Sequence, residues 1–400
     1  MKLLKVIGKI LLWMLAGIAG LALLFFAILA FNTNFSNPDN LEDFVQGKMQ
    51  KAHIPGISIA FIKDDQVTST IYAGYADVEN QTPVTEETLF QIASVSKTVT
   101  GLAIMQLHEK GLIHLDDDIN QYLPFEVVHP KFPEEPITFR MLLTHTAGIA
   151  NNWEVYDSLY TIEAGGGDSP VSLEQFVRGF LTPGGEWYDI DANFTETKPG
   201  DAFHYSNPGY ALLGYLVEEV TQTDFPVYCK TNIFEPLEMN STAWLLADTN
   251  IANLAVPYTP EQTPLPHYSF ATYPDGTLKT TAREYAHLLI AMLNEGSYQG
   301  KALLQPETLE EMLTATADEG NQALTWSYST LEDIYMGKLQ NAKIAGHTGG
   351  DPGIFTIALF NRENKTGLVM FMNTEISLNM KILNFYRLVE RVVQEAGLNS

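Results

Sequence analysis

The stretch that decides the fold of this chain reads Phe-Gln-Ile-Ala-Ser-Val-Ser-Lys-Thr, from residue 90 to residue 98. It leads directly into residues 99–107, whose apolar periodicity predicts a buried helix. Ser94 and Lys97 therefore fall at the first turn of that helix, where side chains three positions apart share one face. We expect the Lys97 ammonium to reach the Ser94 hydroxyl, whereas Ser96 points to a different side.

The Ser94–Lys97 pair is a candidate nucleophile with its base. A serine hydroxyl is a poor nucleophile at neutral pH until a neighbouring group takes its proton. A lysine can take that proton when burial and the positive end of a helix disfavour its charged form. The same spacing also fits a helix N-terminus with a capping serine and a surface lysine. The rest of the chain must decide between these two interpretations.

The composition is that of a folded and strongly acidic chain. Its 400 residues, 46% of them hydrophobic, can bury a large core. This hydrophobic fraction excludes an intrinsically disordered chain. The formal net charge of −25 repels phosphate backbones, so we predict no nucleic-acid partner. None of the nine histidines belongs to an H-E-x-x-H motif, and no phosphate-binding glycine loop occurs. We therefore expect no metal site and no cofactor.

The N-terminal segment carries a membrane signal. Residues 10–31 form an uninterrupted apolar run that follows three lysines. About 20 such residues cross a bilayer, whereas the apolar part of a signal peptide has about 7 to 15. We predict a cytoplasmic basic segment (1–9), an uncleaved single-pass anchor (10–31), a linker (32–40) and an extracytoplasmic domain (41–400), in the periplasm or at the cell surface. A long cleaved signal peptide is the alternative.

The folded part shows strand patterns near both of its ends. Residues of β-branched and aromatic type predict strands at 57–63, 68–75, 323–328, 334–338, 343–347, 355–361 and 367–373. Helical spacing is found between them and at 378–396. We predict an α/β (α+β) fold, with an antiparallel sheet built from both chain ends, flanked by helices, and an inserted, mainly helical subdomain. The glycine-rich residues 150–200 are expected to form a long surface insertion that covers the site.

Two further stretches carry chemistry. Tyr205 and Asn207 lie just before a predicted helix, where a tyrosine near cations can act as a base and an amide can hold a carbonyl group. Residues 345–353, Ala-Gly-His-Thr-Gly-Gly-Asp-Pro-Gly, follow a strand, and their glycines allow backbone N–H groups to approach an oxyanion. Taken singly, the first is also typical of helix punctuation and the second of a hairpin turn.

Together these stretches resemble a known family. The three motifs are Ser94-x-x-Lys97, Tyr205-x-Asn207 and His347-Thr348-Gly349. Their order and spacing are similar to those of the penicillin-recognising serine hydrolases, and most of all to the class C β-lactamase, D,D-peptidase and esterase branch. Residues 142–148 and, more loosely, 276–283 resemble other stretches of that branch. The resemblance covers about residues 41–395 and implies a β-lactamase/transpeptidase-like fold.

The resemblance also implies roles for individual residues. Ser94 would be the acylated nucleophile, with Lys97 and Tyr205 moving its proton. The backbone N–H groups of Ser94 and Gly350 would form the oxyanion hole. The implied substrate-binding and oxyanion residues are Asn207, His347, Thr348, Gly349 and Gly350. His145 and His204 are interpreted as structural.

One departure from the family bears on the substrate. Many β-lactamases and penicillin-binding proteins have a lysine where this chain has His347, and a histidine is largely neutral at pH 7. A lysine would suit a substrate carboxylate, so we expect poor penicillin hydrolysis. The predicted activity is that of a serine hydrolase acting on a small ester or amide or on a peptide. The alternatives are a D,D-carboxypeptidase or D-amino-acid peptidase, and a catalytically silent penicillin-binding-like sensor.

Overall fold

The computed structural model describes residues 40–315, 321–328, 330, 343–376 and 382–398. The predicted basic segment, the predicted anchor and the predicted linker up to residue 39 lie outside these residues. Within the described ranges, no helix combines the length and the apolar character that crossing a bilayer requires. The chain divides into two compact units, Met1–Phe44 and Val45–Ser400. The second unit carries all the predicted site residues, and its fold is described by itself.

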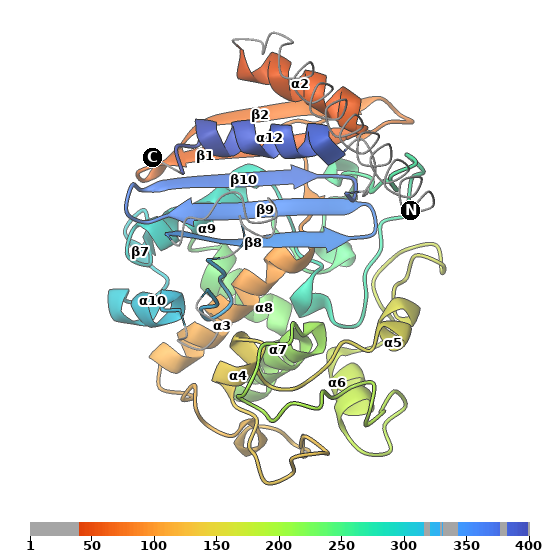
Figure 1. Cartoon of the computed structure of the whole chain (residues 1–400), viewed down its shortest axis with the longest axis vertical. Coiled ribbons are helices and arrows are strands. Elements are labelled where there is room, and N and C mark those ends of the chain that lie inside the picture. The colour runs from red at the N-terminus through yellow and green to blue at the C-terminus, as the bar shows by residue number, and fades with distance from the viewer. Residues whose placement is uncertain (1–39, 316–320, 329, 331–342, 377–381, 399–400) are drawn as a thin grey trace, which may run out of the picture. The chain divides into compact units, whose positions relative to one another are not determined.

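The centre of this unit is a six-stranded antiparallel sheet with the strand order β3-β2-β1-β10-β9-β8 (Figure 1). The N-terminal strand β1 pairs with the C-terminal strand β10, with Ile59 opposite Met370. The sheet is therefore assembled from both chain ends, as the sequence predicted. Its strands are β1 (Gly56–Lys63), β2 (Gln66–Asp77), β3 (Thr82–Pro83), β8 (Ile344–Asp351), β9 (Ile354–Asn361) and β10 (Thr366–Met372).

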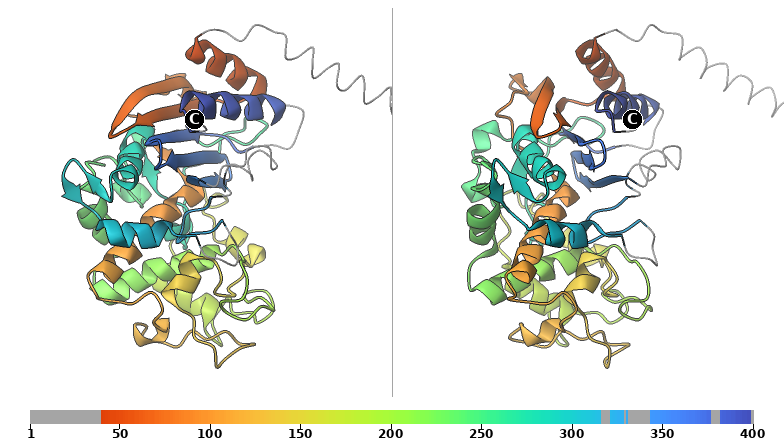
Figure 2. Two further views of the ribbon diagram at one scale, coloured as in Figure 1. Left: turned by 60° about the vertical axis from the view of Figure 1, so that its left-hand side comes forward. Right: turned by 90° about the vertical axis from the view of Figure 1, so that its left-hand side faces the viewer.

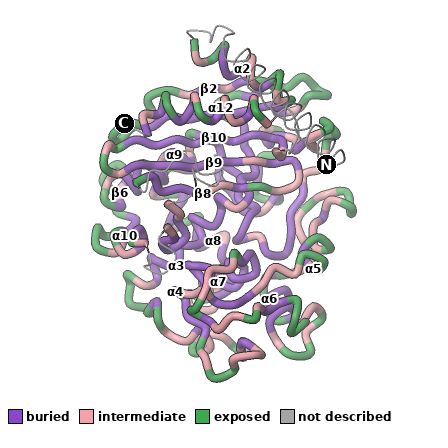
Figure 3. The backbone as a smooth tube through the Cα atoms, in the orientation of Figure 1, coloured by how far each residue is buried: buried purple, intermediate pink, exposed green. Residues whose placement is uncertain are grey.

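Helices cover both faces of the sheet. Helix α9 (Ala282–Leu293) packs against β1 and β10, and α12 (Ile382–Glu395) lies on the opposite face (Figure 2). On that face Phe385 of α12 contacts Phe355 of β9, with 5.3 Å between the ring centroids. Strand β1 is buried at every position except the last, which explains its nearly continuous apolar run. Figure 3 shows the buried backbone passing through the sheet and into the helices beneath it.

A mainly helical region is inserted between the two halves of the sheet. Its helices are α3 (Lys97–Glu109), α4 (Phe139–Leu143), α5 (Trp153–Ser158), α6 (Leu173–Leu181), α7 (Asn207–Thr221), α8 (Phe225–Cys229) and α10 (Pro306–Leu313). Helix α7 begins sharply because the Ser206 hydroxyl accepts the Gly209 N–H at 3.0 Å and Pro208 occupies the first turn. This capped helix start therefore fixes the main-chain positions of Tyr205 and Asn207.

Three predicted elements differ from the structure or fall outside it. Residues 323–328 do not form a strand, and Ser327 makes only isolated bridges to Gly346 and Gln322. The predicted strand 334–338 lies outside the described residues. The glycine-rich stretch after His347 turns only at its end, because β8 continues through Gly349 and Gly350 to Asp351, and the hairpin turn to β9 falls at residues 352 and 353. The glycines in this strand have no side chains, so another segment can approach its main chain closely.

That close approach occurs at Gly349. A Cβ atom there would collide with the main-chain oxygen of Ile92 and with the hydroxyl of Thr356. The same two groups are joined, since the Thr356 hydroxyl donates to the Ile92 carbonyl at 2.7 Å. The glycine thus lets β8 lie against the segment that immediately precedes Ser94.

We expect Gly349→Ala to lower the free energy of unfolding by about 1–3 kcal/mol, because the added methyl group overpacks this contact. Urea denaturation measures the change. Gly350→Ala is the matched control, since a methyl group there meets no atom within 4 Å. Equal stability of the two variants would contradict the close packing of β8.

Candidate active site

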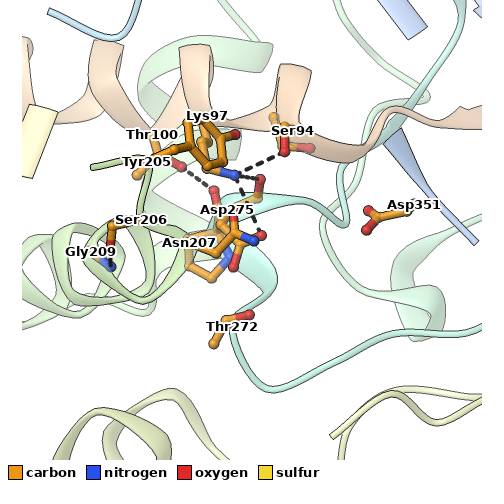
Figure 4. Close-up of polar contacts among 12 residues, drawn as sticks. Ser94, Lys97, Thr100, Tyr205, Ser206, Asn207, Gly209, Thr272, Asp275 and Asp351 are labelled. Carbon is orange, nitrogen blue, oxygen red and sulfur yellow. Dashed lines mark hydrogen bonds and ion pairs between the residues drawn. The ribbon is translucent and has the colours of Figure 1, made fainter. Parts of the chain in front are cut away.

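Ser94 and Lys97 lie on one side of a helix start. Ser94 belongs to a 3₁₀ turn, η1 (Ala93–Ser96), and Lys97 is the first residue of α3. The Lys97 ammonium donates to the Ser94 hydroxyl at 3.1 Å and to the main-chain oxygen of Asp275 at 2.8 Å (Figure 4). Lys97 is completely buried, whereas Ser94 is partly accessible. The hydroxyl can therefore meet a substrate while the amine stays behind it.

Two neighbours of Ser94 fix its position. Ala93 has a φ of +47°, in the left-handed region that residues with a side chain rarely adopt. The buried Ser96 hydroxyl accepts the Leu278 N–H at 3.1 Å, so Ser96 ties α3 to the segment beside it. Ser96 therefore has a structural partner and points away from Ser94, in agreement with the sequence interpretation.

Tyr205 completes the predicted catalytic group. The centroid of its ring lies 5.1 Å from the Lys97 ammonium nitrogen, within the range of a cation–π contact. The ring packs on His145, with 4.4 Å between the centroids, and is 36% exposed. The structure thus brings Ser94, Lys97 and Tyr205 together although more than a hundred positions separate Tyr205 from the other two. Their catalytic roles stay predictions.

Asn207 has an unused acceptor next to this group. It is buried at the first position of α7, and its N–H donates to Asn151 Oδ1 at 2.8 Å. Asn151 Nδ2 in turn donates to the main-chain oxygen of Tyr205 at 2.9 Å, so the insertion supports the Tyr205–Asn207 segment. The Oδ1 atom of Asn207 has no hydrogen-bond partner among the described residues. A buried orphan acceptor is costly, which favours a ligand donor at this position.

The edge of β8 that faces away from β9 presents the predicted oxyanion donor. Gly346 exchanges both of its backbone hydrogen bonds with Ser327, on the side away from β9. Backbone groups alternate along an antiparallel strand, so the groups of Thr348 and Gly350 point to that same side. Strand β8 lies directly against η1. The Gly350 N–H is therefore available on the edge that meets the Ser94 turn.

His347 presents no positive charge to this edge at neutral pH. Burial, and then the nearby Lys97 ammonium, lower the pKa of His347 from 6.5 to about 4. Its Nδ1 atom lies 2.6 Å from the main-chain oxygen of Thr348, so Nδ1 carries the proton. The sequence-based expectation of a neutral group at this position agrees with this environment.

The two histidines interpreted as structural are held by other protein groups. His145 accepts the Ser206 N–H at Nδ1, at 3.0 Å, and burial holds its pKa well below the usual range. Its ring packs against the ring of Tyr205. His204 contacts the Thr197 hydroxyl at 2.9 Å.

The sequence analysis missed Asp275. This residue is 3% exposed, and its carboxylate lies 3.6 Å from the Lys97 ammonium nitrogen. The other carboxylate oxygen accepts a hydrogen bond from the Tyr156 hydroxyl. Pro-Asp-Gly at 274–276 is typical of a surface turn, but here it ends a buried 3₁₀ turn, η6 (Tyr273–Asp275). The only signal was its position next to the stretch 276–283.

Two cavities flank the edge of β8. One, of about 370 Å³, is bordered by His145, Phe203, Tyr205, Thr325, His347 and Thr348, among others. The other, of about 1020 Å³, is bordered by Trp153, Tyr160, Gly350, Asp351 and Glu375, among others. Trp153 and Tyr160 belong to the insertion, which therefore borders the site. Among the described residues that line either cavity, none is a lysine or an arginine.

The site has no metal-binding cluster in the part of the chain that the structure describes. No group of three or more histidine, cysteine, aspartate or glutamate side chains there could hold an ion. Nearby carboxylates have protein partners instead. The Tyr160 hydroxyl donates to Asp351 at 2.8 Å, and burial raises the pKa of Asp351 to about 7.

A family comparison identifies the class of protein to which this chain belongs. The beta-lactamase family model matches residues 41–391. The chain therefore belongs to the beta-lactamase family, a family of serine hydrolases. Protein flp of Staphylococcus aureus (strain N315) is 28% identical over 364 residues, which are 87% of this chain and 69% of that protein.

Solved structures share the fold. EstCE1, a hydrolase with promiscuous acyltransferase activity, matches with a TM-score of 0.67 and 22% identity, over 87% of this chain and 98% of its own. The D-alanine carboxypeptidase AmpC of Burkholderia cenocepacia matches with a TM-score of 0.64 and 22% identity, over 89% and 100%. At this identity the likeness concerns the fold, which does not separate an esterase from a peptidase.

The buried His347 makes stability depend on pH. Its pKa is about 4 in the folded chain against an ordinary 6.5, so the unfolded chain binds the proton first as the pH falls. The free energy of unfolding should therefore decrease between about pH 6.5 and pH 4. We expect His347→Gln to remove up to about 3 kcal/mol of this decrease, measured by chemical denaturation at several pH values. His114→Gln, at an exposed histidine, is the control. If the free energy of unfolding of His347→Gln depended on pH as in the unmodified protein, this histidine would not be the cause of the decrease.

Proposed function

We propose that the domain hydrolyses ester or amide bonds through an acyl-enzyme on Ser94. The observation that carries this proposal is the 3.1 Å contact between the buried Lys97 ammonium and the partly accessible Ser94 hydroxyl. Tyr205 beside Lys97 and the outer edge of β8 beside Ser94 would supply the other groups that acyl transfer needs.

The proposed reaction has two halves. The Ser94 oxygen attacks the substrate carbonyl, and the Tyr205 oxygen, deprotonated in the reacting form beside the Lys97 ammonium, takes the serine proton and then gives it to the leaving group. The N–H groups of Ser94 and Gly350 would stabilise the negative oxygen of the tetrahedral intermediate. Water then attacks the ester on Ser94 and returns the proton to the serine, which releases the acid.

The charges around the cleft favour a substrate without a carboxylate next to the scissile bond. His347 is neutral near pH 7, and the described residues lining the two cavities include no lysine or arginine. Asp351 and Glu375 line the larger cavity instead. A free carboxylate, as in a penicillin or a D-alanyl peptide, would meet no fixed cation among these described lining residues. Neutral esters are therefore our first choice of substrate.

A peptide or amide substrate is the second candidate. The unpartnered Oδ1 atom of Asn207 supports it, because this acceptor suits the N–H of an amide substrate. A penicillin-binding-like sensor would keep the same acylation step but would not hydrolyse the ester on Ser94.

A substrate panel separates these possibilities. We expect the full-length protein to hydrolyse p-nitrophenyl butyrate with a kcat/KM at least about 10-fold above that for nitrocefin or a D-alanyl-D-alanine peptide, because an unpaired carboxylate must be desolvated. Faster release of D-alanine than of p-nitrophenol would assign a peptidase. Stoichiometric labelling without turnover of any substrate would assign a sensor.

Ser94→Ala should lower turnover by about 1000-fold or more and abolish labelling by a fluorophosphonate. Ser96→Ala is the matched control, since Ser96 lies two residues away and has a structural partner. It should still be labelled. Equal labelling of Ser94→Ala and the unmodified protein would show that the nucleophile is another residue.

We also propose that residues 10–31 anchor the domain in a membrane, with the domain outside the cytoplasm. The apolar run and the three preceding lysines support this proposal. Mass spectrometry of the membrane fraction should find the intact N-terminus. A soluble chain that begins after residue 31 would identify a cleaved signal peptide instead.

A further inference from the structure

We propose that Asp275 is a positioning residue, which holds the Lys97 ammonium group against Ser94. The inference rests on the proposed function, because it concerns the same nucleophile. It assigns a role to a carboxylate that none of the three sequence motifs contains.

The geometry around the Lys97 nitrogen supports this role. The ammonium donates to Ser94 at 3.1 Å and to the Asp275 main-chain oxygen at 2.8 Å, and the Asp275 carboxylate lies 3.6 Å away. The side chains of Lys97 and Asp275 are 0% and 4% exposed. Water and salt screen such a pair only weakly. A fully buried ammonium without this carboxylate would lack a counter-charge at contact distance.

Asp275 is also fixed from its far side. Its second carboxylate oxygen accepts from the Tyr156 hydroxyl, which also contacts the Thr272 hydroxyl at 2.6 Å. Burial raises the pKa of Asp275, whereas Lys97, Thr272 and Tyr156 act in the opposite direction. The Thr100 hydroxyl donates to the main-chain oxygen of Pro274 at 2.6 Å and holds the whole turn against α3. The carboxylate thus has little freedom to leave Lys97.

Other titratable groups face this pair from several elements, namely His145, Tyr156, Tyr160, Tyr205, Tyr210, His347 and Asp351. The pKa values of both histidines lie below the neutral range, so these side chains stay uncharged there. Burial raises the pKa values of Tyr156 and Tyr210 far above neutrality. Asp351, with a pKa of about 7, can by itself cause the reaction rate to change with pH near neutrality, which adds a separate limb to a plot of rate against pH. Asp351→Asn therefore serves to identify that limb.

The chemical consequence follows from the position of the ammonium. Negative charge develops on the Ser94 oxygen as its proton leaves, and the Lys97 ammonium faces that oxygen. Asp275 balances the ammonium between turnovers and keeps the nitrogen directed at Ser94. Replacing the carboxylate by a neutral group would remove the negative charge that faces the Lys97 nitrogen at 3.6 Å.

The test measures the rate of fluorophosphonate labelling of Ser94 against pH in the full-length protein, so that the natural substrate need not be known. In Asp275→Asn and Asp275→Ala we expect the acidic limb of this pH profile to move to lower pH by about one unit, because a negative charge beside the site is gone. The labelling rate at the optimum should fall by about 10-fold or more, less than the loss of a direct oxyanion donor costs. Asp275→Glu should return the limb toward its original pH.

Thr100→Val is the matched control, because it disturbs the same turn without removing a charge. It should lower thermal stability but leave the limb in place. The inference is overturned if both neutral Asp275 variants keep the original limb, or if Thr100→Val moves it equally. These outcomes differ from a failure of the proposed function, in which the label would appear on a residue other than Ser94.

Discussion

The organisation of the site depends on one buried ammonium group. Lys97 is completely enclosed, and its nitrogen contacts the Ser94 hydroxyl, the Asp275 main chain and the Asp275 carboxylate. A buried charge is stable only when it is paired and hydrogen-bonded. The α3 helix, the η6 turn and the segment before α7 must therefore meet at this nitrogen.

The sheet supplies the other half of the site. Its edge strand β8 reaches the Ser94 turn because Gly349 has no side chain to keep the two segments apart. The same strand runs between two cavities, with His347 and Thr348 lining one and Gly350 and Asp351 lining the other. A substrate bound along this edge would place its carbonyl group next to Ser94 and extend to either side. Successive residues of β8 thus line one cavity and then the other.

Membership of the beta-lactamase family fixes the fold and the class of chemistry, but not the substrate. EstCE1 and the D-alanine carboxypeptidase AmpC match this chain with similar TM-scores. The features that distinguish substrates are local charges. Here a neutral His347 and four carboxylate side chains, those of Asp157, Glu163, Asp351 and Glu375, border the cleft. These local charges are the basis of our preference for neutral esters.

The sequence by itself determined the sheet from both chain ends, the helix that follows Ser94 and the approach of Lys97 to that serine. These features follow from periodicity and from spacing within one turn, which are local properties of the chain. Only the tertiary structure revealed Asp275, because its Pro-Asp-Gly context is that of an exposed turn until packing against α3 buries it. The continuation of β8 through its glycines was likewise decided by a non-local contact with η1. Burial and the pairing of charges depend on which distant segments meet, and no local pattern contains that information.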